Sequence, residues 1–315
     1  MKVWILADDR AGNVNQLLGI AEALGAPYER KDIRYNRWIR LPNTLRGRTF
    51  IGLDSKCKES LLHDFPDIIL SAGRRSFPIA RAIKHLSQGK TKIVQLMNPL
   101  NGARDADLIV LPFHDNYKGT NKHVMQVLGT PHRVTPQKLA AEKAHWKDVM
   151  KQYPPKRLSL IVGGATKDKP FTVDMADELV QAVKDLKPAS VLVTTSRRTP
   201  SEVVERLQKK LPKPYFFYRF GDKTENPYFG LLSWADEIVV TGDSMSMCTE
   251  CCATGVPVFI FAPDGMMSEK HKRFHASLYA AGVAAPIGGK VPKKMSSINP
   301  ANEIAQRIKQ CAKGK

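Results

Sequence analysis

The chain has 315 residues, of which 43% are hydrophobic and 25% charged, a composition typical of a folded globular protein with two domains. No segment approaches the ~18 consecutive apolar residues of a membrane-spanning helix, and two aspartates follow the first strand-like segment at once, which argues against a signal peptide. The net charge of +19 favours an anionic partner, such as nucleic acid, anionic lipid or a phosphorylated substrate.

The first half of the chain alternates between strand and helix patterns. Its strands are predicted over residues 2–7, 28–33, 67–71, 92–96, 108–111 and 124–127, and its helices over 13–24, 76–86 and 135–150. Pro154 and Pro155 form the best linker candidate, so the first domain is predicted to span residues 1–155.

The second half of the chain repeats this alternation. Its strands are predicted over residues 158–162, 190–194, 215–218, 237–240 and 258–261, and its helices over 172–186, 200–211, 227–235, 245–254 and 268–281. The second domain is predicted over 156–299, with a loop at 282–299. A last helix within 300–315 is expected to pack back on the first domain.

Strands separated by helices of this length predict parallel sheets with right-handed crossovers. The predicted fold class is therefore α/β, with two Rossmann-like domains facing across a cleft. In such folds ligands bind beyond the carboxyl ends of the strands, so the loops that follow the strands are the candidate functional segments.

The most informative segment is 239–261, whose pattern is strand, tight turn, helix, glycine stop and strand. Asp243, Ser244 and Ser246 gather at the start of this helix, where polar groups and the helix dipole favour a phosphate. Glu250 lies one turn beyond Ser246 and can reach ribose hydroxyls attached to that phosphate. The alternative is an ordinary capped helix with a solvated Glu250.

Two other turns of the second domain have phosphate-binding character. Gly163, Gly164 and Lys167 follow the first strand of that domain, where backbone amides and an ammonium group can lie beside a diphosphate. Ser196 and Arg197 follow the next strand in the same way. These five residues are therefore predicted to belong to the same nucleotide-diphosphate site.

The first domain carries candidate acid–base groups. Asp8 and Asp9 follow its first strand at the edge of the predicted cleft, where a carboxylate can serve as a general base. His114 follows a later strand and is a further candidate. Each of these side chains is also compatible with a structural role in its own turn.

A second polar group of the first domain is predicted to bind an acceptor. Arg74 and Arg75 stand at a predicted helix start and suit an anionic acceptor, because guanidinium binds phosphate in a bidentate way. Gly12 permits close approach of a ligand, and Asn15 and Gln16 belong to the same segment. For the two arginines, an ordinary surface position is the alternative.

A basic segment between residues 30 and 48 holds seven Lys or Arg residues against one acidic residue. Tyr35, Trp38 and Leu45 are interleaved with these charges. Such a segment suits peripheral contact with an anionic membrane, where each Lys or Arg contributes ~1 kcal/mol. A solvated basic loop whose apolar residues pack inward is the alternative.

Several functional classes lack their signatures. The GxGxxG, Walker A and HExxH motifs and a Cys/His zinc set are absent, so neither a nicotinamide cofactor nor a metal site is expected. Asp105 and Asp107 form an Asp-x-Asp, but they precede their strand. No nucleic-acid recognition module is visible, so no specific nucleic-acid partner is expected. Five cysteines, three of them on one short helix, indicate free thiols in a reducing compartment.

A series of motifs recurs here in the order of a known family. They are D-x3-G-x2-N-Q from Asp8, SAGRRS at 71–76, GTPHRVT at 129–135, VGG at 162–164, TTSRRT at 194–199, ENPY at 225–228, TGDSMSM at 241–247 with Glu250, and RFH at 273–275. Over nearly its whole length the chain resembles the mitochondrial fission ELM ("elongated mitochondria") family, in its bacterial form. Residue 9 is commonly Gly in that family and is Asp here.

The resemblance implies a GT-B glycosyltransferase-like architecture, similar to MurG-type enzymes and lipid A disaccharide synthase. It implies that Ser244, Ser246 and Glu250 belong to the nucleotide-diphosphate segment, with Glu250 on the ribose, and that Asn226 lies near the base. Plant members of the family are adaptors at the mitochondrial outer surface. Bacterial members have no mitochondrion to divide, which favours an enzyme.

We therefore expect a metal-independent, inverting glycosyltransferase. It would move a sugar from a nucleotide-diphosphate donor, expected to be UDP-linked, to an anionic or lipid-linked cell-envelope acceptor, with no cofactor beyond this co-substrate. The expected location is cytoplasmic and peripheral on the inner face of the membrane. Two alternatives stay open: a non-catalytic membrane-fission adaptor that keeps the fold, and a nucleotide-sugar 2-epimerase.

Overall fold

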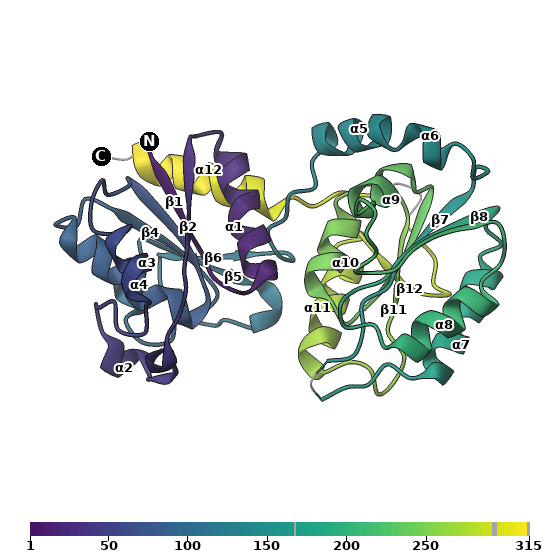
Figure 1. Ribbon diagram of the computed structural model, residues 1–315, viewed down its shortest axis with the longest axis horizontal. Coiled ribbons are helices and arrows are strands. Elements are labelled where there is room, and N and C mark those ends of the chain that lie inside the picture. The colour runs from purple at the N-terminus through teal and green to yellow at the C-terminus, as the bar shows by residue number, and fades with distance from the viewer. Residues whose placement is uncertain (167, 292–294, 314–315) are drawn as a thin grey trace. The chain divides into compact units, whose positions relative to one another are not determined.

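The computed structural model describes residues 1–166, 168–291 and 295–313, and it divides into two compact α/β units (Figure 1). The first unit contains residues 1–133 and the C-terminal helix that begins at Pro300. The second unit contains Val134–Asn299. Each unit is built on its own parallel six-stranded sheet.

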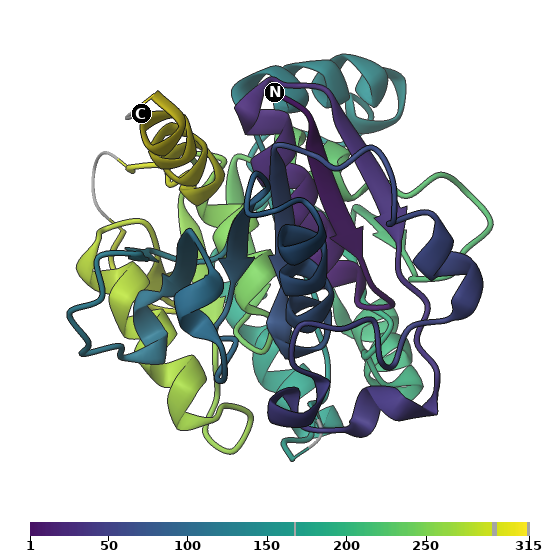
Figure 2. The ribbon, with the colours of Figure 1, turned by 90° about the vertical axis from the view of Figure 1, so that its left-hand side faces the viewer.

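The first sheet has its strands in the order β2-β1-β3-β4-β5-β6, and they run side by side in one direction (Figure 2). The strands are β1 (Val3–Ala7), β2 (Tyr28–Asp32), β3 (Ile68–Ala72), β4 (Lys92–Leu96), β5 (Leu108–Pro112) and β6 (Val124–Val127). β1 and β3 are buried along their whole length, which explains why their sequences are continuous apolar runs. The strand order reverses between β1 and β3, so the switch point of this unit lies there.

Helices cover both faces of this sheet. They are α1 (Ala11–Leu24), α2 (Asn43–Arg46), α3 (Ser55–Glu59), α4 (Gly73–Leu86) and α12 (Pro300–Lys313), with 3-10 turns η1 (Arg37–Arg40), η2 (Ala103–Asp105) and η3 (Phe113–Asp115). Figure 1 shows α12, in yellow, alongside α1, in purple. Ile304 and Ile308 of α12 are buried in one apolar cluster with Leu17 and Ile20 of α1, so the last helix completes the core of the first unit.

The second sheet has the order β12-β11-β10-β7-β8-β9. Its strands are β7 (Arg157–Ile161), β8 (Ser190–Thr194), β9 (Tyr215–Tyr218), β10 (Glu237–Thr241), β11 (Val258–Phe261) and β12 (Ala285–Pro286). In chain order this is the 3-2-1-4-5-6 arrangement of a Rossmann domain. The reversal lies between β7 and β10, where ligands of such domains bind.

The helices of the second unit begin mostly at hydroxyl caps. They are α5 (Pro136–His145), α6 (Lys147–Met150), α7 (Val173–Asp185), α8 (Ser201–Lys210), α9 (Tyr228–Trp234), α10 (Met245–Cys252) and α11 (Glu269–Ala280). The side chains of Thr172, Ser244 and Ser268 each accept a bond from an amide of the following first turn. These caps satisfy amides that have no partner inside the helix.

The α/β class and the two Rossmann-like domains are confirmed, and every predicted strand is present, either with the predicted ends or with ends shifted by one residue. The long helices are also present, but the one predicted over 135–150 is divided into α5 and α6. The two-residue strand β12 falls in the stretch that was predicted to be loop, because two residues carry no readable pattern. The division between the units falls after Arg133 and not near residue 155. α5 belongs to the second unit since it packs on α9, where Trp234 Nε1 donates to Lys143 O at 2.9 Å.

Candidate functional site

Two short turns meet at the switch point of the second unit. Gly163 and Gly164 follow β7, and the turn 242–244 leads from β10 into α10. Gly163 N donates to Thr241 Oγ1 at 2.7 Å, and Gly164 N donates to Asp243 Oδ2 at 2.9 Å. These bonds join the two turns into one edge of the sheet.

Asp243 is the centre of this edge. Its buried carboxylate also accepts bonds from Thr241 Oγ1 at 2.7 Å and from Arg198 Nη2 at 2.7 Å. A buried carboxylate needs such partners, because an unpaired charge is costly away from water. The sequence predicted that Asp243 binds the nucleotide, whereas its carboxylate bonds inward and positions the two turns.

The two glycines after β7 have no room for a side chain. A Cβ on Gly163 would collide with the carboxylate of Asp243, and a Cβ on Gly164 would collide with the backbone of Arg198. Gly12 differs, because nothing lies within 4 Å of the place that its Cβ would take. Of these three predicted site glycines, only the two in the second unit are sterically required. Lys167, predicted to join this turn, lies outside the described residues.

The turn after β8 closes the same edge. Ser196 N donates to Thr199 Oγ1 at 2.9 Å, and the Thr199 hydroxyl donates to Gly163 O. Arg198 N donates to Ser196 Oγ at 3.2 Å, so Ser196 shapes the turn. Arg197 is exposed and forms no hydrogen bond or ion pair with another described residue, which leaves its guanidinium for solvent or a ligand.

The N-terminus of α10 opens at this edge. Ser244 Oγ caps the helix by accepting from Met247 N at 3.4 Å, and Ser246 stands half-buried in the first turn. Within the described part of the chain, no group accepts a hydrogen bond from the amides of Met245 and Ser246. Unpaired amides and the helix dipole together favour an anion at this position.

Glu250 lies one turn further along α10. Its Oε2 accepts a hydrogen bond from the phenol of Tyr228, at the start of α9. Burial raises the pKa of Glu250 to about 7, and the Tyr228 bond opposes this rise. Burial and the neighbouring charge of Glu250 raise the pKa of Tyr228, so the phenol stays protonated and donates.

Asn226, predicted to lie near a base, holds the start of α9. Its Oδ1 accepts from Tyr228 N at 3.0 Å, so the exposed amide side chain fixes the backbone that carries the phenol. The neighbouring Glu225 pairs with His145 Nε2 at 2.9 Å, and both of these side chains are exposed. The ENPY motif thus leads directly to the contact with Glu250.

His275 supports the turn after β10 from α11. Its Nε2 donates to Gly242 O at 2.9 Å, and burial lowers the pKa of this histidine to about 4, so the imidazole is neutral at pH 7. A Cβ on Gly242 would lie 2.5 Å from His275 Cε1, which explains the glycine. His275, Tyr228 and Arg198 stand in the sequence motifs, but no local pattern predicts these contacts.

The first unit has a cavity of about 630 Å³ beyond the carboxyl ends of β1 and β2. Asp8, Asp9, Tyr35 and Arg75 are among its lining residues. Arg75 Nη2 donates to Asp8 Oδ2 at 3.2 Å and to Asp9 Oδ1, and its guanidinium lies 4.7 Å from the centre of the Tyr35 ring. The two predicted carboxylates therefore share one partner, Arg75, which was predicted to bind the acceptor.

The two carboxylates differ in access to solvent. The side chain of Asp8 is 3% exposed and also accepts from Arg10 N at 3.0 Å, whereas that of Asp9 is 67% exposed. A general base must reach the proton that it removes. Asp9 meets this requirement better than Asp8, which the sequence had favoured.

The other candidates of the first unit do not line this cavity. His114 is buried in η3 beyond β5, with its Nε2 4.0 Å from Asp115 Oδ1. Arg74 and Asn15 are exposed, and Gln16 is buried in α1. The structure therefore separates the predicted acceptor group and places only Arg75 beside the aspartates.

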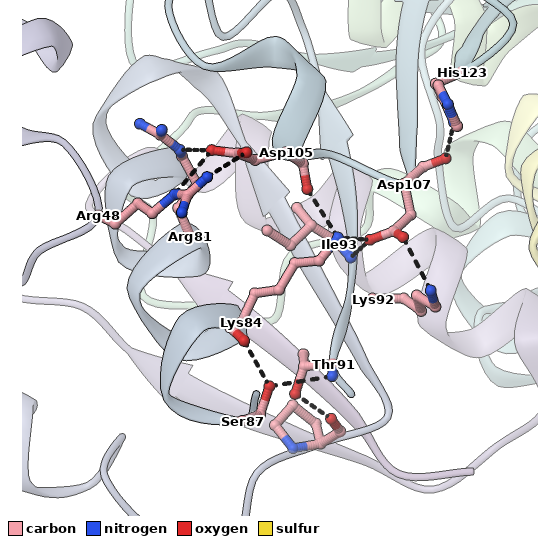
Figure 3. A network of polar contacts seen from close by, with 11 residues as sticks. Arg48, Arg81, Lys84, Ser87, Thr91, Lys92, Ile93, Asp105, Asp107 and His123 are labelled. Atoms are coloured by element: carbon pink, nitrogen blue, oxygen red, sulfur yellow. Dashed lines mark hydrogen bonds and ion pairs between the residues drawn. The ribbon is translucent and has the colours of Figure 1, made fainter. Parts of the chain in front are cut away.

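The two carboxylates of the Asp-x-Asp are held by basic side chains (Figure 3). Asp105 accepts from Arg48 at 2.9 Å and from Arg81 at 2.6 Å. Asp107 accepts from Lys84 Nζ at 2.6 Å. In the residues that the structure describes, no group of three or more His, Cys, Asp or Glu side chains could hold a metal ion.

The basic segment 30–48 divides into structural and exposed charges. Arg46 is fully buried and donates to Arg75 O at 2.9 Å, while Arg30 and Arg48 are paired with acids. Trp38 is 50% exposed and Leu45 is 67% exposed. The exposed cations of this segment that have no ion pair with a described acidic residue are Arg34, Arg37 and Arg40.

Two further observations concern the whole chain. None of the described helices is long and apolar enough to cross a membrane. All five cysteines are free thiols, and those of α10 are buried.

Solved structures with low sequence identity share this fold over the whole chain. The UDP-GlcNAc 2-epimerase of Neisseria meningitidis bound to UDP-GlcNAc has a TM-score of 0.59 at 14% identity, with 99% of each chain covered. HepE of Anabaena in complex with UDP and glucose has a TM-score of 0.51 at 12% identity, covering 100% of this chain and 90% of that one. A UDP-glucosyltransferase from Polygonum tinctorium has a TM-score of 0.51 at 10% identity, covering 100% and 99%. The fold is therefore of the GT-B class.

Sequence comparison is more specific. The chain is 27% identical to the uncharacterized protein RP120 of Rickettsia prowazekii, with 98% of both chains covered. It is 26% identical to the mitochondrial fission protein ELM1 of Arabidopsis thaliana over 81% of this chain, a match that spans 65% of the plant protein. A family model described as "Mitochondrial fission ELM1" matches residues 11–311. The chain belongs to the mitochondrial fission ELM1 family.

Proposed function

We propose that the second unit binds a nucleoside-diphosphate sugar, UDP-linked, at the switch point between β7 and β10. One observation carries this proposal: the turns of Gly163–Gly164 and 242–244 are bonded together beside the open amides of α10, with Glu250 one turn further on. The amides suit the diphosphate and Glu250 suits the ribose hydroxyls. The Neisseria and Anabaena proteins of similar fold are described with UDP-GlcNAc and with UDP and glucose.

The proposed reaction is metal-independent transfer of the sugar to an acceptor hydroxyl with inversion. A general base, for which the exposed carboxylate of Asp9 is the candidate in the first unit, takes the proton from the acceptor hydroxyl, whose oxygen then forms a bond to the anomeric carbon. The bond from that carbon to the diphosphate breaks, and the departing nucleotide carries the negative charge. The amides of α10 and the guanidinium of Arg197 stabilise that charge. Arg75, which also bonds to Asp8, holds Asp9 in place.

The proposed acceptor is anionic or lipid-linked, and the protein is peripheral on the inner face of the membrane. Support comes from segment 30–48, where the apolar Trp38 and Leu45 and the cations Arg34, Arg37 and Arg40 are all exposed. Apolar side chains with cations of this kind suit an anionic lipid surface. This exposed set is smaller than the one expected from sequence, because Arg30, Arg46 and Arg48 have internal partners.

Calorimetry with UDP-, GDP-, ADP- and CMP-sugars tests the donor. We expect binding of one of them, and Asp9→Asn should retain donor affinity while turnover falls by ~10²–10⁴-fold. A folded protein that binds none of the four would refute the proposal and favour the adaptor alternative. A UDP-sugar converted to its epimer without any acceptor would identify a 2-epimerase.

A further inference from the structure

The carboxylate of Glu250 has two different oxygens. Oε2 accepts the bond from Tyr228, whereas Oε1 has no hydrogen-bond partner among the described residues. The carboxyl group is largely buried, but Oε1 keeps some contact with solvent. One oxygen is therefore fixed by Tyr228, and the other keeps its acceptor positions for a ligand.

Tyr228 is itself held in place by its neighbours in the chain. Asn226 caps its amide at 3.0 Å, and Pro227 precedes it at the start of α9. The phenol therefore comes from a fixed backbone on a different helix. A carboxylate that is bonded on one oxygen cannot rotate freely about its last torsion, which reduces the entropy lost when a ligand binds.

We propose that Tyr228 is a positioning residue that holds Glu250 with its second oxygen presented to the vicinal hydroxyls of a ribose. This arrangement makes the site selective for ribonucleotides over 2′-deoxyribonucleotides. The inference rests on the proposed function, because it needs the nucleotide to lie along α10. Without the 2′-hydroxyl, a partly desolvated carboxylate loses a donor, and sites of this kind reject such analogues.

The charge state of Glu250 gives the inference a second readout. Burial raises its pKa to about 7, and the bond from Tyr228 favours the charged form. The other titratable groups that face this pair are Cys248 and Cys251 of α10, and burial keeps the pKa of both thiols high, so they stay neutral. Removal of the phenol should therefore move the titration of Glu250 to higher pH.

The test compares UDP and 2′-deoxy-UDP on wild type and Tyr228→Phe between pH 6 and pH 8.5. At pH 8 wild type should prefer UDP by about 10-fold, and Tyr228→Phe should reduce this preference to about 2-fold. The pH midpoint of UDP binding should lie near 7 in wild type and higher in the variant. Affinity for inorganic pyrophosphate should stay unchanged, because the amides of α10 are not altered.

The matched control is Tyr279→Phe. This tyrosine also faces α10, near Cys248 and Cys252, but does not touch Glu250. It should keep both the selectivity and the midpoint of wild type. If Tyr228→Phe does not fold, Asn226→Ala is used in its place. Both nucleotides carry the same base, so the ratio of their affinities does not depend on any contact between Asn226 and the base.

The outcomes are distinct. Unchanged selectivity and midpoint in the folded variant would overturn the inference and leave the proposed function intact. Wild type that binds neither nucleotide nor pyrophosphate would overturn the proposed function as well.

Discussion

The backbone of Arg198 occupies the place that a Cβ on Gly164 would need. Gly164→Ala is therefore expected to lower the free energy of unfolding by about 1–3 kcal/mol, because the turn after β8 must move. It should also weaken UDP binding, since the same turn carries Arg197, whose guanidinium is proposed to contact the diphosphate. Urea denaturation and calorimetry measure the two effects.

Gly12→Ala is the matched control for this prediction. Gly12 lies in α1 with open space around it, so alanine should raise stability by about 0.5 kcal/mol through its better helix propensity. Equal effects of the two substitutions would contradict the steric role given to Gly164.

The pKa of Glu250 gives a pH dependence with a definite sign. This pKa is about 7 in the folded protein, whereas its ordinary value is 4.5. Between pH 4.5 and pH 7 the folded protein therefore keeps a proton on Glu250 that the unfolded chain has lost. The contribution of Glu250 to the free energy of unfolding is fully present below pH 4.5 and is lost as the pH rises through 7. Glu250→Gln lacks this loss, so relative to wild type it should gain about 2 kcal/mol in free energy of unfolding between pH 5 and pH 8.

Denaturation curves of both proteins at the two pH values check this prediction. A difference between wild type and Glu250→Gln that does not change with pH would show that the carboxyl has an ordinary pKa.

Sequence spacing predicted some of the site residues, but it did not predict where the side chains of others point. Ser244, Ser246 and Glu250 follow from helix geometry, and the structure keeps all three on one helix. The bond between Gly164 and Asp243 joins residues 79 positions apart, and such pairing leaves no local pattern. For the same reason, the contact of Arg75 with both Asp8 and Asp9 could not be predicted.

At the level of elements, α12 is a late segment that completes an early core. Ile304 is fully buried in the cluster that contains Leu17 and Ile20 of α1. Ile304→Ala should lower the free energy of unfolding by about 2–4 kcal/mol, because a cavity forms between the two helices. Gln306→Ala, on the exposed side of α12, should change it by less than about 0.5 kcal/mol. Similar small effects for both variants would show that α12 does not stabilise the first unit in solution.

The element order followed from alternation because buried parallel strands are continuous apolar runs and four helices of the second unit have hydroxyl caps. The boundary between the two units did not follow from the sequence pattern. Pro154 and Pro155 resemble a linker, but α5 packs on α9 within the second unit. Linker composition is a local signal, whereas a domain boundary depends on which distant surfaces pack together.

For the whole molecule, the net charge of +19 and the exposed apolar residues of segment 30–48 predict binding to anionic vesicles. Binding should weaken with salt, and substitution of both Trp38 and Leu45 by Ser should reduce it at least about 10-fold, because their apolar area no longer enters the interface. Phe113→Ser is the control, since Phe113 is also 50% exposed but lies in η3. Equal binding of all three proteins would show attraction by net charge alone, without a defined lipid-binding surface.

The central claim is that a nucleoside diphosphate binds at the turn between β10 and α10. Hydrogen exchange of the backbone amides with and without UDP tests it most directly. The account predicts protection in two segments, 241–252 and 162–165. UDP covers the open amides of α10 and lies against the turn after β7. Protection confined to the cavity of Asp8 and Asp9, or no protection at saturating UDP, would contradict it.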